Sequence, residues 1–158
     1  MINLREKEII ITENLKKYLG CEVIRTNQIA PTPKYPYVSY TIITPMVANN
    51  GTWSEFDDGI HRKEIQQIWS FTVQSQDDME SKTLAFKAYD YLDHDGVVVL
   101  NDNGIVVQRI ENITNRDNLL TIDYEYRNGF DVKFAFMNEI ADETEERIDD
   151  ITINCNIN

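Results

Sequence analysis

The chain has 158 residues, the length of one domain, and such a domain buries roughly two-thirds of the surface of its unfolded chain. Its 27 acidic and 15 basic side chains give a formal net charge of −12, which opposes binding to a phosphate backbone by general electrostatic attraction. With 42% hydrophobic and 10% aromatic residues it is too apolar for a disordered acidic chain, so we expect a folded, soluble protein.

The sequence carries no sign of export or of a membrane span. Met1 to Lys7 places charges where the apolar core of a signal peptide would begin, and no apolar run approaches the roughly 20 residues of a membrane span. Cys21 and Cys155 fit neither a zinc site nor a disulfide framework, so we expect two free thiols in a reducing compartment. We therefore expect a cytoplasmic protein, or part of an assembly built there.

The first third of the chain predicts one helix and one strand. Asn3 and Glu6 form a capping box for a helix over residues 3–19, which Gly20 ends. Three prolines between Thr26 and Pro36 favour an extended linker. A strand follows from Tyr37 to Thr44.

The middle of the chain predicts a long loop, a strong strand and a second helix. Residues 46–59 have no helical or strand period and are predicted as a loop longer than most connections. Residues 65–75 alternate so that one face is nearly all apolar and the other nearly all neutral polar, which predicts a strand. Asp77 with Glu80 marks a helix start, and the apolar spacing continues to Leu92. The apolar run 97–100, a turn at 101–104 and a strand over 105–113 follow.

The even positions from Leu120 to Phe136 are apolar, and Asn128-Gly129 interrupts this run. A two-residue hairpin at this point would mismatch the apolar faces, so we reject it. A three-residue loop with a left-handed Gly129, or one long bent strand, would each preserve the pattern, and we slightly favour the single strand.

Together these elements predict an α+β fold. The order helix, strand, strand, helix, strand, strand implies a mainly antiparallel or mixed sheet of four to five strands, with two helices packed on one face. We expect a single domain over residues 1–140. Residues 141–158 are an acidic spacer followed by a short strand in which Ile151, Ile153, Cys155 and Ile157 alternate with polar residues.

No motif predicts catalysis, a cofactor or a metal site. Asp57, Asp58 and His61, or Asp93, His94 and Asp95, are the acid and histidine clusters that could hold a cation. The second cluster fails the calcium-loop spacing and is better explained as the frayed end of a helix. The glycines form no phosphate-binding loop, and no nucleophile motif is present. Turnover that depends on Asp58 or His61 would revive a small-hydrolase interpretation.

Two features could serve either this chain's own fold or contacts with other chains. Trp53 and Phe56 lie in a polar loop with no core period, so they either fold back as a lid or anchor a neighbouring chain. The terminal strand with Ile151 and Ile153 either joins its own sheet or adds to the edge of a neighbour's sheet.

Three stretches of the sequence resemble the neck or tail terminator proteins of tailed bacteriophages. They are residues 67–78 leading into the helix 81–92, residues 104–110, and residues 123–134 with the spacing Arg127-x-x-x-Asp131; the similarity spans about residues 35–137. The resemblance implies a non-enzymatic virion protein that forms a ring, commonly of six subunits, on the head-proximal end of the tail tube. Its implied partners are copies of itself, the tail tube protein and a head completion or connector protein. DNA would pass through the ring without specific binding.

In such a ring, the polar face of residues 65–75 and the odd face of 121–135 could set the register between subunits, and Arg127 and Asp131 are the pair to test first. A solvated sheet face explains the same residues equally well. The net charge alone also suggests an acidic protein that mimics DNA, which would need carboxylates in two helical rows and a basic nuclease as its partner.

Overall fold

The computed structural model describes residues 1–48, 51–55, 58–118 and 124–141. Its helices are α1 (Leu4–Leu19), α2 (Asp78–Asp90), the π-helical turn η1 (Tyr91–Asp95) and α3 (Val97–Asp102). Its strands are β1 (Glu22–Arg25), β2 (Tyr37–Thr44), β3 (Ser54–Glu55), β4 (Ile60–Ser75), β5 (Ile105–Ile110), β6 (Thr114–Asn115) and β7 (Tyr126–Ala141).

The sheet is mixed and has the order β1-β2-β4-β7-β5, with the short strands β3 and β6 paired to β4 and β7. All its pairs are antiparallel except β1 with β2. The predicted α+β class is confirmed, but β1 is an addition, because residues 22–25 were not predicted to form a strand. The segment 46–59, predicted as loop, contains β3.

Helix α1 follows its prediction closely. The Asn3 side chain accepts a hydrogen bond from the Glu6 backbone amide at 3.2 Å, and Gly20 ends the helix in the left-handed conformation with φ of 70°. Ile11 and Leu15 point into the core and are fully buried. Capping and the apolar stripe thus act at the positions where the sequence places them.

The second helical region is longer than predicted. The Asp77 side chain caps α2 by accepting from the Glu80 amide at 2.7 Å. Beyond α2 the chain continues through η1 into α3, so Asp93, His94 and Asp95 belong to a π-helical turn that Gly96 ends, and not to a frayed helix end. The apolar run at 97–100 is helical and buries Leu100. The chain therefore has three α-helices instead of the two predicted, and η1 joins α2 to α3.

Strands β4 and β7 form the long central ladder of the sheet, with Ile60 opposite Ala141 and Ser75 opposite Tyr126. Asn128 and Gly129 lie inside β7, opposite Val73 and Thr72. The hairpin alternatives are therefore wrong, and the single strand is confirmed. Residues 120–123 of the predicted strand and the terminal segment 142–158 lie outside the described residues.

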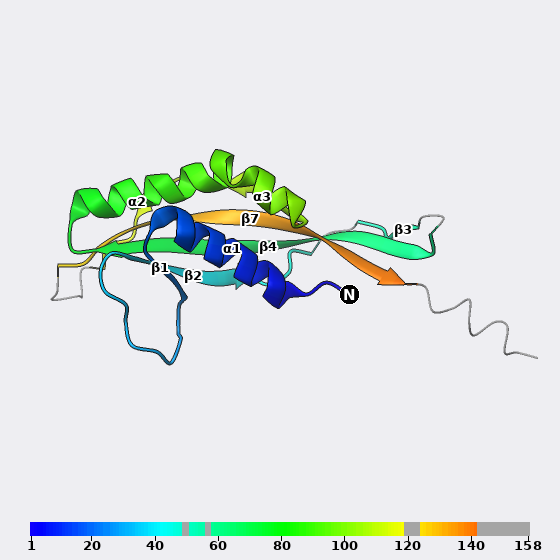
Figure 1. Ribbon diagram of the computed structural model, residues 1–158, viewed down its shortest axis with the longest axis horizontal. Helices are drawn as coiled ribbons and strands as arrows, with labels where there is room; N and C mark the ends of the chain where they lie inside the picture. The colour runs from blue at the N-terminus through cyan, green and yellow to red at the C-terminus, as the bar shows by residue number, and fades with distance from the viewer. Residues whose placement is uncertain (49–50, 56–57, 119–123, 142–158) are drawn as a thin grey trace, which may run out of the picture.

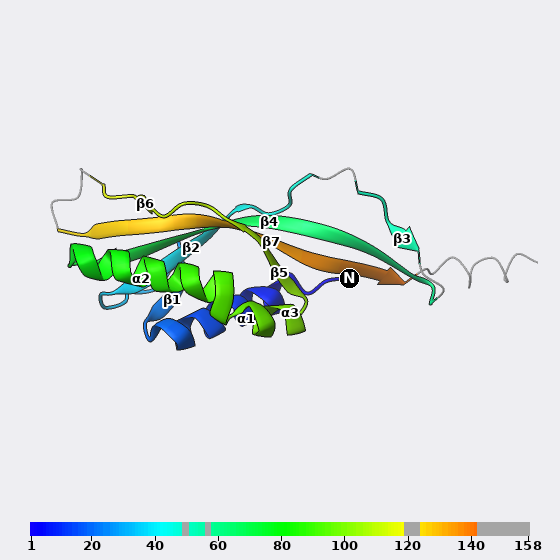
Figure 2. The ribbon, with the colours of Figure 1, turned by 90° about the horizontal axis from the view of Figure 1, so that it is seen from above.

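The core lies between one face of the sheet and the helices (Figures 1 and 2). Alternate residues of β4 and β7 fill it, with the rings of Trp69 and Phe134 edge to face at 5.4 Å between centroids. Asn128 also faces the helices, where its side chain donates to the Ser81 hydroxyl of α2 at 2.9 Å. We call the opposite side of the sheet the open face.

Beyond the helices, the far ends of β4 and β7 run on together with β3 as a ribbon (Figure 1). We call this ribbon, residues 53–55, 58–64 and 137–141, the arm. No helix among the described residues is long and apolar enough to cross a membrane.

Candidate assembly surfaces

The arm is held together by Arg62. Its guanidinium contacts Asp58 at 2.8 Å and Glu139 at 2.7 Å, so it ties the turn before β4 to the end of β7. The hydrogen bonds to Asp58 and Glu139 raise the pKa of Arg62, and the bond from Arg62 lowers the pKa of Asp58. The carboxylate of Asp58, one of the candidate metal ligands, is therefore already paired with the guanidinium of Arg62.

The arm also exposes apolar side chains. Trp53 is 41% exposed, Met137 is 49% exposed and Ile140 is 42% exposed. A hollow of about 370 Å³ on the arm is lined by both β4 and β7, with Arg62, Lys63 and Met137 among its residues. Phe56, the other aromatic singled out in the loop 46–59, lies outside the described residues. An exposed tryptophan on a ribbon without helix cover has the properties of an interface anchor.

The open face is organised by Arg116, a residue that no sequence pattern singled out. Its Nη1 donates to Ser70 Oγ at 2.6 Å and to Thr72 Oγ1 at 3.0 Å, and its Nη2 contacts Asp131 at 3.0 Å. Arg116 follows β6 in a polar stretch with no periodicity, so the sequence gives no signal for its role.

Arg127 and Asp131 have different partners in the structure. The Arg127 guanidinium pairs with Glu125, and its backbone amide donates to Asp117 at 2.6 Å. Asp131 pairs with Arg116. The two predicted interface residues therefore share the open face but not a contact.

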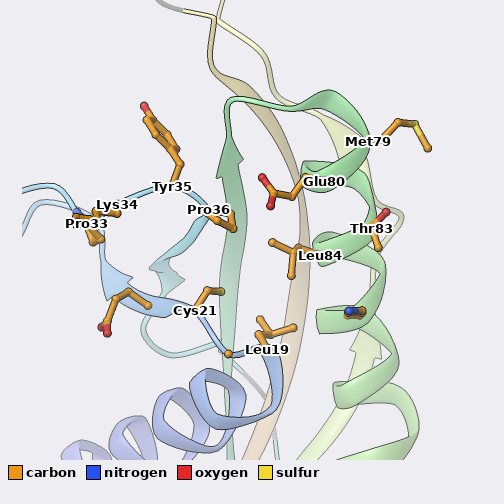
Figure 3. A pocket seen from close by; sticks show the side chains of 13 residues that line it. Leu19, Cys21, Pro33, Lys34, Tyr35, Pro36, Met79, Glu80, Thr83 and Leu84 are labelled. Carbon is orange, nitrogen blue, oxygen red and sulfur yellow. The ribbon is translucent and has the colours of Figure 1, made fainter.

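A groove of about 780 Å³ lies at the end of the sheet away from the arm. It is bounded by the end of α1, the start of β1, the segment 33–36 and α2 (Figure 3). Leu19, Cys21, Pro36 and Leu84 point into it (Figure 3). Burial raises the pKa of the Cys21 thiol, and Glu22 and Glu80 add to the shift.

No group of three His, Cys, Asp or Glu side chains in the described part of the chain could hold an ion. Asp57, from the first candidate cluster, lies outside the described residues. His94 Nδ1 lies 2.7 Å from Asp95, whose other oxygen accepts from the Tyr18 hydroxyl at 2.5 Å. The hydrogen bond to Asp95 raises the pKa of His94. The hydrogen bond from Tyr18 to Asp95 links α1 to η1.

Comparisons with known proteins identify the family. The family model described as phage neck terminator protein matches residues 10–158. No curated protein matches the chain. One solved structure, which carries no functional name, aligns over 84% of this chain and 92% of its own at 11% identity and a TM-score of 0.44.

The family match confirms the resemblance read from residues 35–137 and indicates a structural part of a phage, in the tail or neck of the virion, with tail and head proteins as its general neighbours. Because the match covers nearly the whole sequence, the chain belongs to the phage neck terminator family.

Proposed function

We propose that this chain forms a closed ring at the head-proximal end of the tail tube, stops the growth of the tube and gives the head connector protein its docking surface. A ring of identical subunits needs head-to-tail contacts, in which each subunit uses two different patches. The resemblance implies six subunits. On this proposal the protein is assembled in the host cytoplasm and has no enzymatic activity.

One structural observation supports the ring: the arm and the groove are different surfaces at opposite ends of the sheet. The groove adjoins Pro36, next to the pair Tyr37 with Gln74, whereas the arm ends at the pair Ile60 with Ala141. These positions are 14 residues apart on β4, roughly 46 Å at the usual rise of a strand. A subunit of this form can offer one end to each of its two neighbours.

The net charge of −12 fits a ring through which DNA passes. Carboxylates facing the lumen would repel the phosphate backbone and keep DNA from adhering. Under this proposal the protein meets DNA without binding it specifically.

The proposal is tested by imaging the purified protein, alone and mixed with tail tubes, by negative-stain microscopy, with mass from light scattering. We expect ring particles in solution or rings at the tube ends. In a phage lacking the protein, we expect tubes of uncontrolled length. Bare tube ends in the presence of excess protein, or tubes of normal length without it, would contradict the proposal.

A further inference from the structure

The groove between α1 and α2 has an apolar floor and a charged rim. Leu19, Pro36 and Leu84 contribute the floor together with Cys21 (Figure 3). Its rim carries two acids, Glu22 and Glu80, and two lysines, Lys34 and Lys87. A floor of this kind suits a short apolar segment, and the rim decides which charge that segment should carry.

The two acids of the rim already have partners within the subunit. Glu22 pairs with Lys16 at 3.1 Å, and Glu80 accepts a hydrogen bond from the Ser75 hydroxyl. Lys34 and Lys87 form no ion pair with any residue in the described ranges. The Ser75 hydroxyl leaves the charge of Glu80 in place, so the rim sets two lysines against one acid that has no ion pair with a described residue, and it carries a small excess of positive charge beside apolar surface.

The 17 residues after β7 have the complementary chemistry. Residues 142–150 contain six acids and one arginine. Ile151, Ile153, Cys155 and Ile157 then alternate with Thr and Asn, so in extended conformation they present one apolar edge. This is an apolar segment that follows directly on an acidic one.

This segment leaves β7 at the end of the subunit that lies away from its own groove. From Ala141 to Ile151 the chain spans at most roughly 36 Å when fully extended. The groove lies roughly 46 Å away along β4 by the usual strand rise. Ile151 therefore falls short of its own groove, and Cys155 and Ile157, at most roughly 50 and 58 Å from Ala141, would reach it only with the chain close to full extension. A neighbour placed head to tail brings its groove to the arm without that extension.

A second groove, of about 690 Å³, lies beside the first half of α1, and among its lining cations only Arg5 has no ion pair with a described residue. Glu8 pairs there with Arg25 at 3.3 Å and accepts from the Tyr40 hydroxyl at 2.7 Å. It offers less to an acidic segment than the first groove does.

We propose that residues 150–158 of each subunit dock in the α1–α2 groove of the next subunit of the ring. The three isoleucines pack on the floor, and the preceding carboxylates lie beside Lys34 and Lys87. This inference rests on the proposed ring and identifies the segment that joins its subunits.

The natural cysteines test the contact directly. Cys155 shares its edge with the isoleucines, and Cys21 lines the groove. Mild oxidation at alkaline pH, or a short bismaleimide, should link each subunit to the next and give covalent species of two, three and more chains on a non-reducing gel. C21S and C155S each keep one thiol per chain, so a link between Cys21 and Cys155 predicts that both variants stay monomeric on the gel. Dimers of C21S at the wild-type yield, or a link confined within single chains, would overturn the inference.

Paired substitutions test the chemistry of the same contact. I153D should weaken assembly roughly tenfold or more, since it places a carboxylate where the proposal packs an isoleucine on the floor, whereas N154D on the opposite edge should have little effect. K34E and K87E should each reduce the linked yield about twofold or more, and K17E, on the outer side of α1, should not. Equal effects of I153D and N154D would contradict docking.

Light scattering and imaging of the same samples separate the two proposals. Failure of the wild-type protein to assemble, with or without tubes, refutes the ring. Rings that form normally in I153D, without any link through Cys21, refute this inference and leave the ring intact.

Discussion

The guanidinium of Arg116 lies directly over Gly129, so that a Cβ atom on Gly129 would come within 3.0 Å of Nη1. The backbone amide of Arg116 also donates to the Arg127 carbonyl at 2.8 Å. Together these two contacts hold the segment that carries β6 against the open face. Gly129 therefore serves a close approach between segments and not a turn, although Asn-Gly is a common turn sequence.

We expect G129A to destabilise the fold strongly. The new Cβ would lie 2.2 Å from the Phe71 carbonyl oxygen, and that backbone cannot move without disturbing the β4–β7 ladder. Overpacking of this kind costs about 2 kcal/mol of the free energy of unfolding. Urea unfolding followed by circular dichroism measures it. K133A on the open face of the same strand is the control and should stay within about 0.5 kcal/mol of wild type.

The partners of Asp131 can be distinguished by double-mutant cycles. The pair Arg116 and Asp131 is partly buried, and we expect a coupling of roughly 0.5 kcal/mol or more between R116A and D131A. Arg127 and Asp131 are four residues apart on one strand, roughly 13 Å, so R127A and D131A should be additive within about 0.3 kcal/mol. Urea unfolding of the single and double variants gives both values. The opposite ranking would contradict the assignment of Arg116 as the partner.

Sequence patterns predicted the elements whose two faces differ most. Strands β4 and β7 alternate because one face is buried under the helices while the other carries polar residues such as Ser70 and Asp131. Strand β1 has only four residues between Gly20 and the prolines, so its conformation depends on pairing with β2 and leaves no pattern in the sequence.

The candidate surfaces also differ in whether the sequence alone could predict them. Trp53 could be singled out because a large aromatic in a polar segment has no core position to fill. The groove could not be predicted, since its lining comes from four segments that only the fold brings together. Arg116 was missed for a related reason: its partners Ser70 and Asp131 lie 46 and 15 residues away.

The environment of Cys21 predicts slow, strongly pH-dependent alkylation. Burial raises its pKa, so at any pH below that pKa a smaller fraction is thiolate than in an unfolded chain, and the thiolate is the reactive form. In the C155S variant, the rate with iodoacetamide should still be rising at a pH where the rate of the unfolded chain has levelled off. The same variant in denaturant provides the reference. A midpoint at or below that of the unfolded chain would show that the thiol is not shielded.

Trp53 is the side chain on the arm that we expect to matter most for assembly. It is 41% exposed and lies outside the core, so W53A should change the free energy of unfolding by less than about 1 kcal/mol. If it anchors a neighbour, its loss should weaken ring formation roughly 30-fold, the effect of removing an aromatic hot spot worth about 2 kcal/mol. F86A is a matched control, because Phe86 is an exposed aromatic on α2, away from the arm. Light scattering across a concentration series measures both variants. Assembly of W53A at wild-type concentrations would remove Trp53 from the interface, and equal loss in F86A would mean that exposed aromatics act without regard to position.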